Sequence, residues 1–168
     1  MRFRIEQSFP AGRDTVLAAL TDPTYLHALG ELPDVGAPVL RRQERAPDGS
    51  SVVQELEFAF RGHLPAPVTR VVDPRRLSWV EHTDVDLLAA TGRFRMVPVH
   101  YARFFTCHGT WMLEERAADA TTRVIDGDLK VHSPVPFVGG QVERAIVSGL
   151  RERLAHEPAV FARWRAGS

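Results

Sequence analysis

Hydrophobic and polar residues alternate at the start of the chain, at the two-residue period of a β-strand. Residues 2–9 place Phe3, Ile5 and Phe9 on one face and charged or polar side chains on the other. A strand with one buried and one exposed face shows this pattern. We therefore predict a half-buried strand over 2–9 that ends at Pro10-Ala11-Gly12.

Helical spacing follows this strand. Val16 and Leu20 lie four residues apart, so one face of a short helix is apolar. Asp22 then occupies an N-cap position with Pro23 at the first helical position, and Gly30 follows as the terminator. Two short helices are therefore expected after the first strand.

The period of two returns from residue 38 to about residue 131, interrupted by segments rich in Pro, Asp and Gly or Ala. Turn residues at such regular intervals are typical of an antiparallel meander. Within it, residues 76–97 form one strand, two strands or a bulged strand. The predicted strands of the meander are 38–46, 51–62, 66–72, 76–83, 91–97, 103–115 and 121–132.

The last segment, from Phe137 to Trp164, changes to a helical period. Gly149 lies on the same face as its apolar residues. This pattern predicts a long amphipathic helix, which Pro158 kinks or restarts because proline removes a backbone hydrogen bond. The apolar residues four apart are Val138, Val142, Ile146, Leu150 and Leu154.

A half-apolar sheet must bury its apolar face, and the last helix is the only element long enough to cover it. We predict an α+β fold in which a curved antiparallel sheet of six or seven strands wraps around the long C-terminal helix. The two short helices close one end. The 168 residues, 44% of them hydrophobic, suit a single domain over 1–168 without repeats or linkers.

Charge and composition narrow the partners and the compartment. Twenty-one basic residues balance 21 acidic ones, which disfavours a nucleic-acid partner. No apolar run approaches the roughly 18 residues of a transmembrane helix. Charges alternate through Met1 to Glu6 where a secretory signal would be apolar, and Cys107 is the only cysteine, so a cytoplasmic location is expected.

Two segments of the chain carry a family resemblance. Phe9-Pro10-Ala11 followed by Thr21-Asp22-Pro23 resembles the first strand and helix start of the START-like superfamily, also called SRPBCC or helix-grip proteins. Val135 to Glu143 resembles the start of the last helix in an uncharacterised, mainly actinobacterial branch of it. The resemblance covers essentially the whole chain. It implies an apolar cavity between sheet and helix that binds lipids, sterols or polyketides, and some members are cyclases or dehydratases.

The alternation assigns the residues that face this cavity. Glycines on the inward stripes either leave volume for a ligand or mark bends and bulges in a curved sheet. The two inward tryptophans are core or cavity wall rather than a cofactor platform. A binding cavity of roughly 300–1,000 Å³ is expected. The candidate ligand-binding residues are Phe58, Phe60, Trp79, Phe105, Cys107, Gly109, Trp111, Ile125, Gly127, Leu129, Val142, Ile146 and Gly149.

The motifs of common enzymes are absent: there is no GxSxG, GxGxxG, P-loop or HExxH. The histidine spacing and the single cysteine disfavour a metal site, and no cofactor is implied. Candidates for an acid or base in the cavity are His63, His82 and Tyr101, each of which is otherwise an ordinary surface residue. Cys107 is expected to be an inert core thiol, and His108 to face outward together with His132.

Two segments have alternative roles. Residues 84–99 form either an irregular loop or flap over the cavity or a charged hairpin. The apolar segment 134–138 is a gate, a membrane-touching tip, a dimer contact or a clasp that fixes the start of the last helix. Transient membrane contact and either a monomer or a homodimer therefore remain open.

These observations lead to three functional hypotheses. The first is non-catalytic binding or transport of a hydrophobic small molecule, because the inward stripes are apolar and show no polar constellation. The second is a cyclase or dehydratase of the lyase type acting on a polyketide-like substrate, which needs a titratable side chain in the cavity. The third is an interaction module without a cavity. Fold alone does not choose among them.

Overall fold

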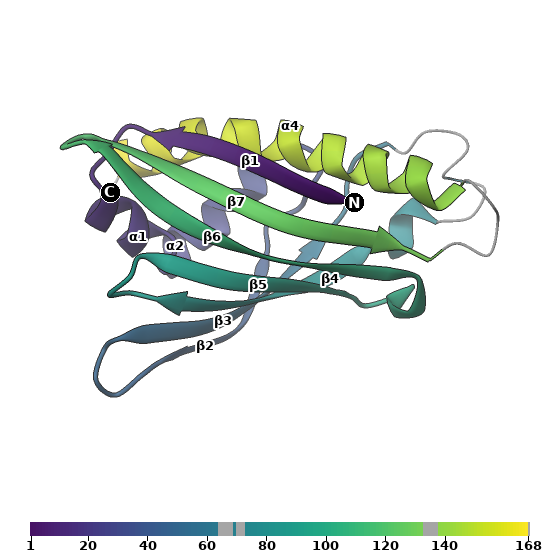
Figure 1. The fold of residues 1–168 in the computed structure, drawn as a ribbon, viewed down its shortest axis with the longest axis horizontal. Helices are drawn as coiled ribbons and strands as arrows, with labels where there is room; N and C mark the ends of the chain where they lie inside the picture. The colour runs from purple at the N-terminus through teal and green to yellow at the C-terminus, as the bar shows by residue number, and fades with distance from the viewer. Residues whose placement is uncertain (64–68, 70–72, 133–137, 168) are drawn as a thin grey trace.

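A seven-stranded antiparallel sheet forms one layer of the molecule, with strand order β1-β7-β6-β5-β4-β3-β2 (Figure 1). The computed structural model describes residues 1–63, 69, 73–132 and 138–167. The alternation seen in the sequence is the burial pattern of β1, whose odd residues are buried and even residues exposed. The strands are β1 (Arg2–Phe9), β2 (Val39–Arg45), β3 (Ser51–Ala59), β4 (Ser78–Asp86), β5 (Thr91–Pro98), β6 (Phe105–Ala117) and β7 (Ala120–Val131).

The long helix α4 (Val138–Ala166) covers one face of this sheet, as predicted. It runs mainly against β1 and β7, while the β2–β3 hairpin lies away from it (Figure 1). The helix continues past Pro158, so the proline does not restart it. The architecture is the expected helix-grip arrangement of a curved sheet around a C-terminal helix.

Two short helices follow β1, also as predicted: α1 (Arg13–Ala19) and α2 (Pro23–Ala28). The Asp22 carboxylate caps α2 by accepting from the backbone N–H of Thr24 at 2.7 Å. Gly30 is not a left-handed terminator, because a 3₁₀ helix (Leu29–Glu31) continues from α2. Glycine is required there because a Cβ atom would lie 2.5 Å from the Cα of Ala37.

Residues 76–97 resolve into two strands joined by a turn at 87–90. The flap expected as one alternative is therefore a charged hairpin, and Leu88 at its tip is 81% exposed. Phe60 lies beyond the end of β3, where it forms an isolated bridge with Val35 and donates its backbone N–H to the carbonyl oxygen of Leu77. Apart from Thr69, the predicted strand 66–72 lies outside the described residues, as do residues 133–137. Two further 3₁₀ turns are Pro74–Arg76 and Ala102–Phe104.

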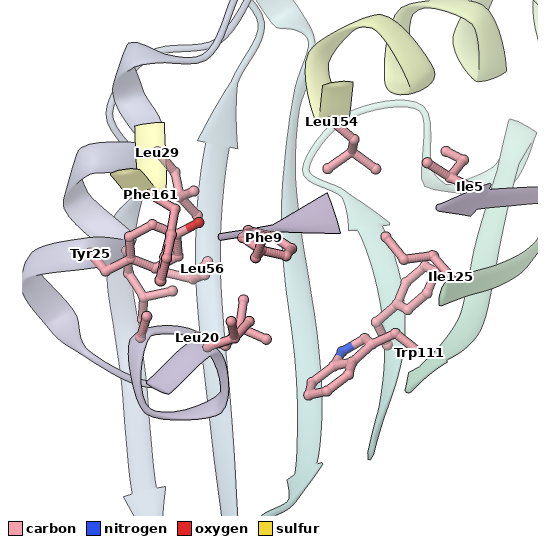
Figure 2. Close-up of a cluster of buried hydrophobic side chains, with 14 of the residues drawn as sticks. Ile5, Phe9, Leu20, Tyr25, Leu29, Leu56, Trp111, Ile125, Leu154 and Phe161 are labelled. Carbon is pink, nitrogen blue, oxygen red and sulfur yellow. The ribbon is translucent and has the colours of Figure 1, made fainter. Parts of the chain in front are cut away.

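The core fills the space between the sheet, α4 and the short helices. Figure 2 shows Tyr25, Leu29 and Phe161 together at the end closed by the short helices. The ring of Phe161 meets those of Tyr25 and Phe9 edge-on, with centroids 5.8 and 5.4 Å away. The aromatic rings are therefore tightly packed at this end, and Leu20, Leu26 and Leu29 of the short-helix region also line the cavity described below.

Candidate functional site

A cavity of about 90 Å³ lies between the sheet and α4. Its volume is smaller than the range expected from the sequence, because large side chains from both layers occupy most of the interior. An apolar cavity of roughly 150 Å³ accepts a benzene molecule, so the present space suits a group smaller than one ring. Its apolar walls include Leu56, Phe58, Phe94, Trp111, Ile125 and Leu154.

Four charged side chains also reach the wall of this cavity. Glu81 comes from β4, Arg123 from β7, and Arg153 and Glu157 from α4. The expectation of an interior without a polar constellation is therefore wrong. Charged groups are seldom buried unless they are paired, so the partners of each one decide what the cavity can do.

Arg123 and Glu157 form a buried ion pair between Nη2 and Oε2. Gln7 joins them: its Oε1 accepts from Arg123 Nε at 2.7 Å, and its Nε2 donates to Glu157 Oε2 at 2.9 Å. Tyr25 donates its hydroxyl hydrogen to the other oxygen of Glu157 at 3.1 Å. These contacts satisfy both charges and connect β1, β7, α2 and α4.

Arg153 has no comparable partner. Its side chain is 9% exposed, and its guanidinium carbon lies 5.4 Å from the ring centre of Phe58 and 5.7 Å from that of Trp79. Within the described part of the chain it forms no ion pair, and its Nε atom is buried without a hydrogen-bond partner. The indole N–H of Trp79 is likewise buried and unpaired among these residues. One unused donor, Arg153 Nε, therefore belongs to a residue of the wall, and the other, Trp79 Nε1, to a residue behind it.

The Glu81 carboxyl is the acidic group that remains on the wall once Glu157 is paired. Thr83 donates to it through a long contact of 3.5 Å. Burial raises the pKa of Glu81, and the charges of Arg153 and Arg123 oppose this shift. Burial in turn lowers the pKa of Arg153. A carboxyl group that holds its proton more readily than usual is suited to donate a hydrogen bond or a proton.

The three acid–base candidates from the sequence do not line the cavity. His63 is exposed beyond the end of β3. His82 lies on the outer face of the sheet, where its Nδ1 is 3.2 Å from Glu55 Oε1 beside a hollow of about 260 Å³ lined by charged residues. Tyr101 lies between β5 and β6, and its hydroxyl oxygen accepts from the backbone N–H of Asp73. His108 and His132 are exposed, as expected.

Of the predicted ligand-binding residues, Phe58, Trp111 and Ile125 line the cavity. Trp79 lies behind the wall, where its ring stacks on that of Phe58 at 5.5 Å. Gly149 is exposed on α4, and a Cβ atom there would meet nothing within 4 Å, so the prediction that it faces the cavity is wrong. The other non-glycine candidates are not among the residues that line the cavity: Phe60, Phe105, Cys107, Leu129, Val142 and Ile146.

The inward glycines do not contribute cavity volume. A Cβ atom at Gly109 would lie 2.2 Å from the backbone oxygen of Asp126 and 2.7 Å from the ring of Phe94. At Gly127 it would lie 2.3 Å from the ring of Phe3. The two glycines face each other across β6 and β7 in regular register, without a bulge. Both therefore allow aromatic rings to approach the sheet closely.

Sequence reasoning missed the charged residues although a signal was present. Glu81 has the same parity as Trp79, and Arg123 has the same parity as Ile125, so both fall on stripes assigned to the interior. Arg153 and Glu157 are four residues apart beside the apolar stripe of α4. Each of these residues could have been identified by asking which inward-facing positions carry a charged side chain.

Two further properties limit the chemistry of the described residues. They include no group of three or more His, Cys, Asp and Glu side chains that could hold a metal ion. Among the helices they form, none combines the length and hydrophobicity needed to cross a membrane.

Solved structures share this arrangement of sheet and helix. TTHA0849 from Thermus thermophilus superposes with a TM-score of 0.67 at 18% identity, covering 100% of this chain and 99% of that chain. The Zhui aromatase/cyclase from Streptomyces sp. R1128 gives 0.65 at 15% identity, covering 98% and 93%. The di-domain ARO/CYC BexL gives 0.66 at 15% identity, covering 96% of this chain and 46% of that chain. These structures therefore share the fold of this chain, a curved sheet around a long C-terminal helix.

The family follows from the sequence itself. Residues 4–164 match the family model described as "Protein of unknown function (DUF2505)", and the chain belongs to this family. A comparison with curated proteins found no match. The resemblance to a mainly actinobacterial branch stays a prediction, because none of these comparisons tests it.

Proposed function

We propose that the protein binds a small hydrophobic molecule, without transforming it, in the cavity between the sheet and α4. The observation that carries this proposal is a cavity with apolar walls from both layers and polar groups at one side. Binding sites for small molecules commonly combine these two features. The helix-grip fold of the solved relatives supports the same location.

The cavity must widen to admit even one aromatic ring. Met96 and Leu150 line it with flexible side chains, and both are only partly buried. Arg153 is among the longest side chains in the wall. Rotamer changes at these three positions enlarge the space without moving the sheet.

The test is binding of the neutral fluorescent probe N-phenylnaphthylamine to the purified protein. Leu150→Trp places an indole in the cavity and is expected to abolish binding, while Leu88→Trp adds the same group at the exposed β4–β5 turn and leaves binding intact. Circular dichroism and thermal melting establish that both variants are folded. The proposal is contradicted if the unmodified protein does not bind the probe. It is also contradicted if folded Leu150→Trp binds the probe as well as the unmodified protein does.

A second candidate function is a dehydratase or cyclase, favoured by Glu81 on the cavity wall. In the dehydration of a β-hydroxy ketone, the ionised carboxylate of Glu81 removes a proton from the α-carbon. Arg153 stabilises the enolate oxygen, and the protonated carboxyl then returns that proton to the departing hydroxyl. The products are an unsaturated ketone and one water molecule, and Glu81 is regenerated. The aromatase/cyclase description of the Zhui relative supports this chemistry.

The matching experiment follows conversion of the aldol adduct of benzaldehyde and acetone to benzalacetone. Turnover that is lost in Glu81→Gln, with N-phenylnaphthylamine binding retained, supports catalysis. Binding of the probe without turnover of the adduct counts against this second candidate and favours simple binding. The exposed Glu152 on α4 supplies the control substitution Glu152→Gln.

A further inference from the structure

Arg153 is the least satisfied charged group in the described interior. It lies in the cavity wall at 9% exposure, stacked over the rings of Phe58 and Trp79, with its Nε atom unpaired. Cation–π contacts stabilise the guanidinium charge, but an aromatic hydrocarbon ring has no acceptor oxygen or nitrogen, so these contacts do not supply the acceptors that its N–H donors need. The buried guanidinium therefore retains capacity to bind acceptor oxygens.

Arg123, which lines the same cavity, differs from Arg153 because its charge is paired and its Nε donor is used. Glu157 pairs with it, and Gln7 accepts from its Nε atom. Arg123 and Glu157 together contribute no net charge. The electrostatic character of the cavity is therefore set by Arg153 and Glu81.

Glu81 does not neutralise Arg153 by direct contact, since no ion pair joins them in the described structure. Burial raises the pKa of Glu81, which favours the uncharged carboxyl. Glu81 and Glu157 attract Arg153 from a distance, but no acidic side chain of the described residues contacts its guanidinium as a counter-charge. An anion that enters would supply that counter-charge.

A second unused donor lies behind the wall, close to Arg153. The indole N–H of Trp79 is buried and unpaired in the part of the chain described, and Arg153 lies 5.7 Å from the centre of that ring. A carboxylate has two oxygens with several acceptor positions and matches the planar guanidinium. Neutral hydrocarbon groups satisfy neither donor.

We propose that the ligand is an organic anion whose carboxylate binds Arg153 while its apolar body lies against Phe58, Trp111 and Ile125. This inference deepens the proposed binding function and rests on it. It names the ligand class as an aromatic or aliphatic carboxylate rather than a neutral lipid or sterol.

The test compares cinnamate with cinnamamide, which have the same shape and differ in charge. Isothermal titration or ligand-observed NMR gives the affinity of each for the unmodified protein. Cinnamate is expected to bind at least roughly tenfold more tightly, the effect of one charge-assisted hydrogen bond in a desolvated site. Equal affinities for the two compounds overturn the inference.

Variants assign the preference to Arg153. Arg153→Met keeps an apolar side chain of similar length and is expected to remove the preference for cinnamate while cinnamamide binds as before. Arg153→Lys keeps the charge and retains part of the preference. Arg151→Met, at an exposed position of the same helix, leaves both affinities unchanged. A full preference that survives in folded Arg153→Met contradicts the assignment.

The two proposals fail in different ways. If N-phenylnaphthylamine binds but cinnamate shows no advantage over cinnamamide, the cavity is a site for neutral ligands and only the present inference falls. If cinnamate, cinnamamide and N-phenylnaphthylamine all fail to bind, both the proposed binding function and the preference for carboxylates are contradicted.

Discussion

Tyr25 donates its hydroxyl hydrogen to Glu157 across 3.1 Å and thereby ties the short helix α2 to the long helix α4 inside the core. Tyr25 is fully buried, and burial together with the neighbouring carboxylate raises the pKa of its hydroxyl. The phenol therefore keeps its proton and remains a donor. Since Arg123 and Gln7 donate to the same carboxylate, one side chain of α4 holds the helix against two strands and a second helix.

Removal of the arginine from this network is expected to destabilise the fold strongly. Arg123→Met leaves the Glu157 carboxylate buried without its counter-charge, and such a loss costs about 3–5 kcal/mol. Arg163→Met breaks another ion pair of α4, with Glu31, in which both side chains are more than half exposed. Exposed pairs contribute about 0–1 kcal/mol. Urea denaturation of the two variants measures the difference, and equal losses would contradict the assigned role of the buried pair.

Two glycine substitutions are expected to change stability in opposite directions. Gly109→Ala brings a methyl group to 2.2 Å from the backbone oxygen of Asp126, which cannot move without disturbing β7. Overpacking of this kind costs about 1–3 kcal/mol. Gly149→Ala places its methyl in open space within a helix, where alanine is favoured over glycine by about 1 kcal/mol. Thermal melting should show a lower midpoint for the first variant and a higher one for the second.

Cys107 is expected to resist thiol reagents in the native protein. Its side chain is 5% exposed, and burial raises the pKa of the thiol to about 12. Only a very small fraction is thiolate at neutral pH, and the thiolate is the reactive form. Labelling with iodoacetamide should be negligible in buffer and complete in denaturant. Rapid labelling of the folded protein would show that β6 opens to solvent.

Glu81 is expected to impose a pH dependence on stability. Burial raises its pKa in the folded state, while Arg153 and Arg123 oppose the shift and Glu157 adds to it. The folded protein therefore binds this proton more tightly than the unfolded chain does. Its contribution to stability is fully present below the unfolded pKa and is lost as pH rises through the folded pKa.

Glu81→Gln removes this dependence because the amide does not ionise. The free energy of unfolding of the variant, measured in urea at several pH values, should gain on that of the unmodified protein as pH rises. Glu152→Gln alters an exposed carboxylate of α4 and serves as the control. A constant difference between Glu81→Gln and the unmodified protein across pH would refute the shift.

The fold could be predicted from the sequence because its determinants are local. Alternation defined the strands, and Asp22-Pro23 marked the start of α2. The number of strands within 76–97 could not be predicted from the sequence. In the structure, Ala90 adopts a left-handed backbone conformation at the end of the turn between β4 and β5.

The site was less accessible to sequence reasoning. Inward stripes were identified from their apolar members, so Glu81 and Arg123 were passed over although they share those stripes. The partner of each charge depends on side-chain position: Arg123 contacts Glu157, whereas Arg153 contacts aromatic rings. Cavity volume could not be obtained from the glycines, because Phe94 and Phe3 come from other strands to fill the space above them.

Arg153 and Glu157 lie one helical turn apart on α4, and they serve separate purposes. Glu157 stabilises the fold, since its loss would remove the contacts of α4 with Arg123, Gln7 and Tyr25. Arg153, in the proposal above, determines what the cavity accepts and contributes no ion pair within the described residues. Ligand preference can therefore diverge among homologues, or be redesigned, by substitution of Arg153 alone. The contacts of Glu157, one helical turn away, would still hold α4 against the sheet.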